Sequence, residues 1–149
     1  MIFTKQSILA AIEKGKLTIT PFDESSLKEA SYSFTLDTRI RKLKSVPVVD
    51  LDKAEFEEGT IGKDGYIMRP GEFVVGYTRE KLTLHGRYAC ILSTRGTIAQ
   101  KGLAALLTDT FCEPDTDNQI ALAMHNVSGL PIKLVPGLRI VKGVFTLVK

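Results

Sequence analysis

The sequence contains few of the residues that bind metals. Its 149 residues include two cysteines, two histidines and no tryptophan. Structural zinc sites usually take four cysteine or histidine ligands, and the zinc-dependent nucleobase deaminases need His-x-Glu followed by Pro-Cys-x-x-Cys. Neither pattern is present, so we expect no zinc cofactor and no zinc-dependent deamination.

Long apolar runs are also absent. No run approaches the ~18 residues of a membrane-spanning helix, and the opening MIFTKQSILAAIEKG lacks the basic segment and apolar stretch of a signal peptide. We therefore expect no membrane partner and a cytoplasmic location, in a cell or an infected host. Cys90, in the apolar run YACIL, is typical of a buried free thiol.

Positive and negative residues are interspersed along the sequence, and neither sign forms a long run. The chain has 20 Lys and Arg against 17 Asp and Glu, a net charge of +3. The densest basic stretch runs from Arg39 to Lys44. It has two interpretations: a patch for polyanions or, as we prefer, a solvated strand edge that resists aggregation. Nucleic-acid surfaces usually combine a basic stripe with aromatic residues, so nucleic acid is not an expected partner.

The remaining composition is that of one globular domain. A chain of this length, 44% hydrophobic, is long enough to bury a core, so we expect a single domain over residues 1–149. The one clear helix is predicted near Ser7–Lys14, with Ser7 as its N-cap and Gly15 after its last turn.

The rest of the sequence predicts short strands separated by turns. Tyr32, Phe34 and Leu36 recur at the period-two spacing of a strand, whereas residues 52–65, DKAEFEEGTIGKDG, are predicted to be turn-rich. Strands are expected at 16–20, 31–40, 46–51, 66–68, 72–78, 81–84, 88–92, 103–108, 119–125, 132–135 and 138–148. Many short strands at close spacing indicate an all-β sandwich or barrel.

Residues 93–103, STRGTIAQKGL, follow a predicted buried strand and combine a cation, a glycine and a hydroxyl. A guanidinium and the backbone N–H groups at a helix start both favour phosphate oxygens, so one interpretation is a phosphate-binding turn. The other is an ordinary strand exit, with Arg95 as a structural or interface residue.

Six segments, taken in order, resemble the dCTP deaminase and dUTPase superfamily, and most closely its dCTP deaminase branch. They cover nearly the whole chain and read SILAAIEKGKLTITPF, EASYSFTLD, RPGEFVVGYTREKLTL, STRGTIAQKGL, FCEPDTDNQIALAMHN and LPIKLVPGLRI. The resemblance implies an all-β, distorted jelly-roll-like barrel (the dUTPase-like, or β-clip, fold) with one short N-terminal helix. It also implies a homotrimer with active sites between subunits and a pyrimidine deoxynucleoside triphosphate, dUTP or dCTP, as ligand.

The resemblance also implies a set of nucleotide-binding residues. Arg95 matches the arginine that holds the triphosphate, and Thr97 matches the second of two serines beside it. Gly96 replaces the first serine, with the loss of one hydroxyl. Asn126 matches the asparagine that ends the family's strand motif, and we assign it to the nucleotide site with the other three.

Two carboxylates are implied to be catalytic. Glu113 matches an aspartate that, in dUTPases, activates water for attack on the phosphate chain. Asp115, two residues on, would assist or help to hold a hydrated Mg²⁺ that arrives with the nucleotide; no metal bound by the protein alone is expected. The alternative is that Glu113 and Asp115 are solvated carboxylates of a hairpin turn.

The sequence departs from the family at other positions. Ala123 stands where deaminases carry their essential glutamate, and general acid–base help is worth ~10²–10⁴-fold. Ser33, Thr35 and Asp37 stand where the motif has aspartate, arginine and glycine. Because the chain ends at Lys149, soon after its last predicted strand, we also expect no C-terminal arm to close over a nucleotide.

Three functions therefore stay open. The first is an enzyme of the family: a dUTP diphosphatase, or a dCTP deaminase whose chemistry has been relocated. The second is a non-catalytic binder of pyrimidine deoxynucleotides. The third is a trimeric structural or interaction protein, for example viral or accessory, that kept the fold and lost the site. We expect a family protein that acts on or binds these nucleotides.

Overall fold

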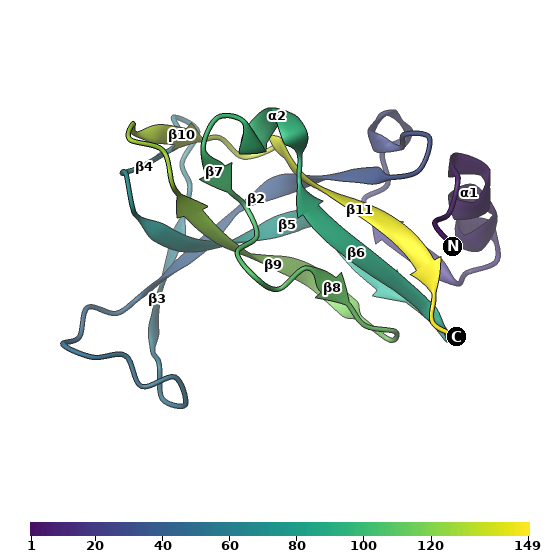
Figure 1. Cartoon of the computed structure of the whole chain (residues 1–149), viewed down its shortest axis with the longest axis horizontal. Helices are drawn as coiled ribbons and strands as arrows, with labels where there is room; N and C mark the ends of the chain where they lie inside the picture. Colours follow the sequence, from purple (N-terminus) through teal and green to yellow (C-terminus); the bar gives the residue numbers. More distant parts are fainter.

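The computed structural model describes all 149 residues, and antiparallel strands dominate it (Figure 1). The helices are α1 (Lys5–Glu13) and α2 (Gly96–Ala99), with a short 3₁₀ helix at Glu24–Ser26. The strands are β1 (Leu17–Thr20), β2 (Tyr32–Leu43), β3 (Phe56–Thr60), β4 (Tyr66–Met68), β5 (Phe73–Leu84), β6 (Tyr88–Thr94), β7 (Leu103–Ala104), β8 (Phe111–Cys112), β9 (Asp117–Asn126), β10 (Ile132–Leu134) and β11 (Arg139–Leu147). The all-β prediction is confirmed.

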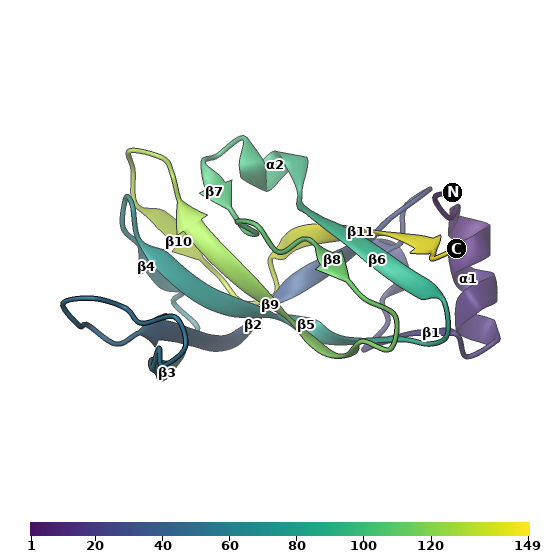
Figure 2. The same ribbon diagram turned by 60° about the horizontal axis from the view of Figure 1, so that its bottom comes forward.

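One large sheet curls around the core, and a small sheet lies beside it (Figure 2). The strands of the large sheet follow the order β7-β9-β5-β2-β11-β6-β8, with β1 added to β5 and β3 added to β2. Strands β4 and β10 form the second sheet. None of the helices is long and apolar enough to span a membrane.

Alternating side chains of the long strands form one core of 28 buried residues. In β2, Tyr32, Phe34 and Leu36 are fully buried, as the period-two spacing predicts. Helix α1 covers one end of the core with Ile8 and Ala11.

The predicted helix exists, but it begins earlier than expected. Thr4, not Ser7, is the N-cap: its side chain accepts a hydrogen bond from the Ser7 backbone N–H at 3.3 Å. The sequence offers two hydroxyl residues three positions apart, and either satisfies the preference at this position. Gly15 follows the helix with φ +67°, the left-handed conformation that glycine adopts most easily.

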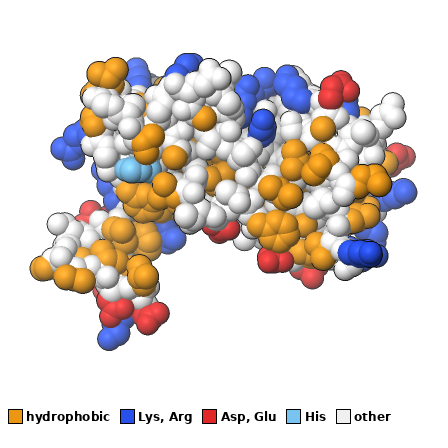
Figure 3. Space-filling view, viewed as in Figure 1, with side chains coloured by type: hydrophobic (Ala, Val, Ile, Leu, Met, Phe, Trp, Pro, Cys, Tyr) orange, Lys and Arg blue, Asp and Glu red, His pale blue; other side chains and the backbone are white.

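One strand prediction and one turn prediction between β2 and β4 are wrong. Residues 46–51 are a loop that projects from the body, and its valines and Leu51 are exposed (Figures 1 and 3). Pro47 lies within this loop and has no N–H to donate to a sheet. Conversely, the predicted turn-rich segment contains β3, which pairs with residues 39–43 of β2.

This pairing also corrects the interpretation of the basic stretch. Strand β2 is not an edge, because β3 lies alongside it and places Glu58 opposite Arg41 and Glu57 opposite Lys42. Opposite charges on facing residues of two strands stabilise their pairing. The Arg39 guanidinium also lies 3.6 Å from the centre of the Tyr77 ring. The cations of this stretch therefore have partners inside the chain.

The remaining differences concern short strands and one long strand. The predicted strands 72–78 and 81–84 form a single strand, β5, with an irregularity between Tyr77 and Lys81. The predicted strand 103–108 is only two residues long, and β8 is equally short and was not predicted.

Candidate functional site

A polar hollow of about 380 Å³ lies where β6 leads into α2. It is lined by Lys28, Ser31, Ser33, Arg95, Gly96, Thr97, Gln100 and Lys142. The lining contains three cations, several hydroxyls, no hydrophobic residue and no carboxylate. We call it the polar hollow.

Arg95 lies between the end of β6 and the start of α2, and hydrogen bonds to the neighbouring strand β11 hold it in place. Its backbone N–H donates to the carbonyl of Ile140 at 3.0 Å, and its Nη1 donates to the carbonyl of Arg139 at 3.2 Å. A guanidinium has five N–H donors, so most of its donors stay free. Arg139 is itself tied down, since its Nη2 donates to Ser25 Oγ at 2.8 Å. The strand-exit and phosphate interpretations of Arg95 are therefore compatible.

The three cations of the polar hollow have no anionic partner. Lys28, Arg95 and Lys142 take part in none of the chain's four ion pairs. The Lys28 side chain forms one hydrogen bond, of 3.4 Å, to the backbone carbonyl of Ser25. Like charges gathered without counter-charge repel one another, so a bound anion would stabilise this arrangement.

The smaller residues of the hollow leave room for a ligand. An added Cβ at Gly96 would meet nothing within 4 Å, and Thr97 is exposed. Ser33 is almost fully buried, yet no residue of the chain accepts or donates a hydrogen bond at its hydroxyl. Because Ser33 stands where the family motif has aspartate, this chain lacks the one carboxylate expected at the hollow.

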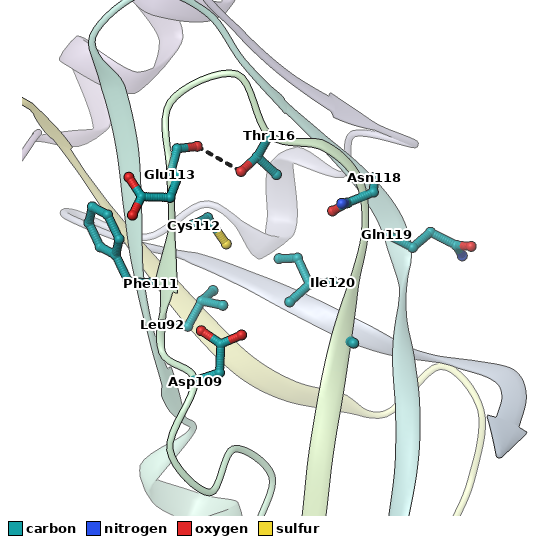
Figure 4. Close-up of a pocket in the computed structure, with 10 residues that line it drawn as sticks. Leu92, Asp109, Phe111, Cys112, Glu113, Thr116, Asn118, Gln119 and Ile120 are labelled. Carbon is teal, nitrogen blue, oxygen red and sulfur yellow. Dashed lines mark hydrogen bonds between the residues drawn. The ribbon is translucent and has the colours of Figure 1, made fainter. Parts of the chain in front are cut away.

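A second site, the hairpin pocket, lies at the turn between β8 and β9 (Figure 4). It has a volume of about 280 Å³ and is lined by Leu92, Asp109, Phe111, Cys112, Glu113, Thr116, Asn118, Gln119, Ile120 and Ala121. Glu113 is exposed, and its carboxylate has no partner in the chain. Its backbone carbonyl accepts a hydrogen bond from Thr116 Oγ1 at 2.7 Å, which fixes the turn.

The two predicted catalytic carboxylates have different surroundings. Glu113 lines the hairpin pocket, whereas Asp115 does not. Asp115 is the only non-glycine residue with positive φ, at +67°. It stands where the family motif, Asp-Pro-Gly, has glycine, and aspartate is among the few residues that tolerate this conformation. Asp115 therefore has the conformation of a turn residue.

Asp109 is a pocket carboxylate that the sequence did not point to. It lies in the segment between β7 and β8 and reaches the same pocket as Glu113. Asp109 belongs to no sequence motif and to no periodic hydrophobic pattern, because its place in the pocket depends on how β8 pairs with β6. The sequence carries no signal that would have found it.

The side chain of Asn126 forms hydrogen bonds only within the chain. It is fully buried, and its Nδ2 donates to the carbonyls of Met68 and Leu130 at 3.0 and 2.8 Å. Its Oδ1 accepts from the backbone and the hydroxyl of Ser128. No amide atom stays free for a nucleotide, so Asn126 supports the β9 end instead.

Ala123 lies on the outward face of β9. It is half-buried, while the flanking Leu122 and Met124 are fully buried in the core. A one-residue shift of the alignment would therefore place a core side chain at the position of the deaminase glutamate. At this position the outward face carries a methyl group, which cannot move a proton.

The polar hollow and the hairpin pocket share no residue of one chain. Cys112 lies opposite Cys90, five residues before Arg95 on β6, which at ~3.3 Å per residue corresponds to roughly 16 Å. Figures 1 and 2 likewise place α2 and the β8–β9 turn well apart. Within one chain, Arg95 and Glu113 therefore belong to separate sites.

Comparison with known proteins identifies the family to which this chain belongs. The family model described as dCTP deaminase-like matches residues 2–148, and the chain belongs to this family. The "dCTP deaminase, dUMP-forming" of Thermobifida fusca is 32% identical over 146 residues, which are 94% of this chain and 74% of the relative. The protein with the same description from Mycobacterium ulcerans is 33% identical over 147 residues, covering 94% and 77%.

Solved structures show the same fold. The 2'-deoxycytidine 5'-triphosphate deaminase of Agrobacterium tumefaciens superposes with a TM-score of 0.74 at 14% identity over 98% of this chain. The match spans 48%, about half, of the Agrobacterium chain. The dUTPase of Streptococcus mutans superposes with a TM-score of 0.55 at 17% identity, over 89% of this chain and 95% of that one. The predicted dUTPase-like barrel is confirmed.

Proposed function

We propose that the protein binds a pyrimidine deoxynucleoside triphosphate, with the triphosphate in the polar hollow. The observation that carries this proposal is the gathering of Lys28, Arg95 and Lys142 with hydroxyl groups and without a carboxylate. Guanidinium and ammonium groups form charge-assisted hydrogen bonds with phosphate oxygens. Thr97 and Gly96 would add a hydroxyl and close backbone approach. Such a ligand fits a cytoplasmic protein.

The complete site would be formed by two copies. Since the hollow and the hairpin pocket are separate within one chain, we propose that the hollow of one copy faces the hairpin pocket of the next. Closed rings of identical subunits are a common solution for such an interface. We propose a homotrimer, with three equivalent sites.

The reaction that we propose is hydrolysis of the phosphate chain and not deamination. Glu113, exposed and without a partner, would act as the general base that activates water, releasing pyrophosphate and dUMP from dUTP. Deamination would need a proton-carrying group at position 123, where this chain has alanine. The relatives described as dUMP-forming dCTP deaminases must remove both the amine and pyrophosphate, and we propose that this chain keeps the second step.

Magnesium would enter as part of the substrate. The polar hollow contains no carboxylate, and no group of three or more His, Cys, Asp or Glu side chains in the chain is arranged to hold a metal. Mg²⁺ keeps several waters and often binds proteins through substrate phosphates. The ion would therefore be held by the triphosphate, with Glu113 of the facing copy near its water shell. We propose no zinc.

A second candidate is a nucleotide binder without turnover that acts as a regulatory or interaction protein. The loss of the aspartate at Ser33 favours it, because this loss leaves the cationic hollow intact and removes a carboxylate beside it. Both candidates require triphosphate binding, and they differ in whether the phosphate chain is cleaved.

The test is incubation with dUTP or dCTP and Mg²⁺, with products separated by chromatography and binding measured by calorimetry. We expect dUMP and pyrophosphate from dUTP and no ammonia from dCTP. Glu113→Gln should lower hydrolysis by about 10²–10⁴-fold without weakening binding. Asp115→Asn tests the other carboxylate of the same turn: because Asp115 lies outside the hairpin pocket, we propose that it is not catalytic and expect this variant to keep activity.

The outcomes separate the candidates. Binding without cleavage by the unmutated protein would favour the second candidate. Ammonia release from dCTP would contradict the assignment of Ala123. The absence of any triphosphate binding would overturn both candidates.

A further inference from the structure

The only two cysteines of the chain face each other across neighbouring strands. Cys90 of β6 lies directly opposite Cys112 of β8, and both thiols are free. Cys90 is fully buried and Cys112 is 8% exposed. They are 22 positions apart in the sequence, and only the β6–β8 pairing brings them together.

The backbone spacing suits a disulfide. Residues directly opposite in an antiparallel pair have Cα atoms about 4.5–5.5 Å apart, within the 4.4–6.8 Å that disulfides usually span. A hydrogen bond of 2.6 Å from the Leu92 N–H to the Thr110 carbonyl fixes the register next to the pair. Strand β8 is two residues long and lies at the sheet edge, so small adjustments of its backbone cost few hydrogen bonds.

The two thiols have different surroundings. Cys112 lines the hairpin pocket, and Figure 4 shows its sulfur on the side of Ile120. A small oxidant that enters the pocket can therefore reach it. Cys90 lies behind it in the core, where its Sγ occupies space left by Gly143: a Cβ at that glycine would lie 2.6 Å from the sulfur.

The two thiols also differ in pKa, and the more accessible one, Cys112, has the lower pKa. The side-chain contact with Cys90 lowers the pKa of the Cys112 thiol, against the opposing effects of burial and of Asp109. Burial raises the pKa of Cys90 well above its usual range. The thiolate is the reactive form of cysteine, so Cys112 is the nucleophile of the pair and Cys90 keeps its proton.

We infer that Cys90 and Cys112 form a peroxide-sensitive dithiol, in which Cys112 is oxidised first and Cys90 then closes an intramolecular disulfide. The oxidant is a hydroperoxide such as hydrogen peroxide. The Cys112 thiolate attacks one peroxide oxygen: an S–O bond forms, the O–O bond breaks and hydroxide leaves, giving a sulfenic acid. The Cys90 sulfur then attacks the Cys112 sulfur, the S–O bond breaks, and the Cys90 proton leaves with the departing hydroxide as water. Overall, two thiols and one peroxide give one disulfide and two waters.

Oxidation should also affect the reaction proposed above, and this consequence rests on the proposed function. Glu113 directly follows Cys112, so a bond between β8 and β6 shifts its carboxylate. Displacement of a reacting group by about 1 Å can cost ~10²-fold in rate. We expect the oxidised protein to hydrolyse dUTP about ten- to a hundredfold more slowly, with activity restored by dithiothreitol.

The test is intact-mass analysis of the native protein treated with one equivalent of hydrogen peroxide. We expect a loss of two hydrogen atoms, with peptide mapping that links Cys90 to Cys112. In Cys90→Ser, a dimedone adduct should appear at Cys112, because no thiol remains to close the disulfide. In Cys112→Ser, the same treatment should leave Cys90 unmodified, since it is buried behind the pocket.

Three results would overturn the inference: thiols that stay reduced, a disulfide between two chains, or sulfinic acid at Cys112 in the unmutated protein. A disulfide that forms without any change in hydrolysis would overturn the effect on Glu113 alone. If the reduced protein shows no hydrolysis, the proposed hydrolytic function is wrong. The mass measurement would still show whether Cys90 and Cys112 form a disulfide.

Discussion

At the scale of single residues, Arg95 connects the fold with the proposed function. One of its nitrogens donates to the Arg139 carbonyl, and the rest of its guanidinium is available to the polar hollow. The structural contact explains how Arg95 is held in place, and its unpaired charge provides the attraction for phosphate. For any substitution of Arg95, both the nucleotide affinity and the stability of the protein therefore have to be measured.

Replacing Arg95 by alanine should weaken dUTP or dCTP binding by about ten- to a hundredfold, since a hydrogen bond to a charged group is worth roughly 1.5–3 kcal/mol. Arg95→Lys should recover only part of the affinity, because an ammonium lacks the planar fork. Calorimetry measures the affinity, and thermal unfolding of the same samples reports the loss of the Arg139 contact.

Gly96→Ser is the complementary variant. It restores the hydroxyl of the family motif, and nothing lies within 4 Å of the added Cβ. We expect affinity to stay unchanged or to improve. A large loss of affinity in this variant, with stability unchanged, would mean that the triphosphate does not lie against the β6–α2 turn.

At the scale of elements, a cluster of three side chains joins β2, β4 and the start of β5. Glu72 lies next to the Tyr66 hydroxyl, accepts the Arg69 backbone N–H at 2.8 Å and pairs with Lys42 Nζ at 3.4 Å. Burial alone would raise the pKa of Glu72, but its hydrogen bonds with Tyr66 and Arg69 and the charge of Lys42 together lower it.

We predict that Glu72→Gln lowers the free energy of unfolding by about 2 kcal/mol at neutral pH, the scale of a hydrogen bond to a charged group. Because the folded-state pKa of Glu72 lies below its unfolded value, its stabilising effect is fully present above the unfolded pKa. It is lost as pH falls through the folded-state pKa. Urea unfolding from pH 7 down to pH 3 should show the two proteins converging in acid.

Glu55→Gln is the control for this prediction. Glu55 is exposed and pairs with Lys44 at 2.8 Å, and exposed ion pairs add little to stability. Its unfolding midpoint should match that of the unmutated protein. An equal effect of both substitutions would show that general surface charge, and not the Glu72 cluster, determines the acid response.

The elements also show what local sequence can and cannot predict. Alternation of large apolar residues predicted β2, because Tyr32, Phe34 and Leu36 all face the core. Strand β3 was missed, since Glu57 and Glu58 are poor strand formers and β3 depends on its pairing with β2. Residues 46–51 were predicted as a strand because valine favours strands, but no neighbouring strand pairs with them.

At the scale of the whole molecule, the candidate site could be predicted only in part. The family motifs pointed to Arg95 and Glu113, which line the polar hollow and the hairpin pocket respectively. The pairing of Cys90 with Cys112, the position of Asp109 and the internal role of Asn126 depend on contacts between distant segments. No local pattern encodes such contacts.

The separation of the two sites leads to a prediction about assembly. If the hollow of one chain works with the hairpin pocket of another, the protein should be a trimer in solution, with three times the 16.4 kDa mass of one chain. Light scattering at micromolar concentration measures this mass, and Arg95→Ala should leave it unchanged. A monomer at this concentration would be inconsistent with a shared site.

The most direct test of a site shared between chains is hydrolysis of dUTP by mixed trimers. Arg95→Ala and Glu113→Gln chains carrying different tags are co-expressed and purified through both tags, so that each trimer contains both variants. Where Arg95 of one chain meets Glu113 of the other, the site is complete. In a closed ring with two chains of one variant and one of the other, one site of the three, or about a third, regains both residues. A site shared between neighbouring chains predicts hydrolysis well above that of either variant alone. Activity no higher than that of the separate variants, from intact trimers, would contradict it.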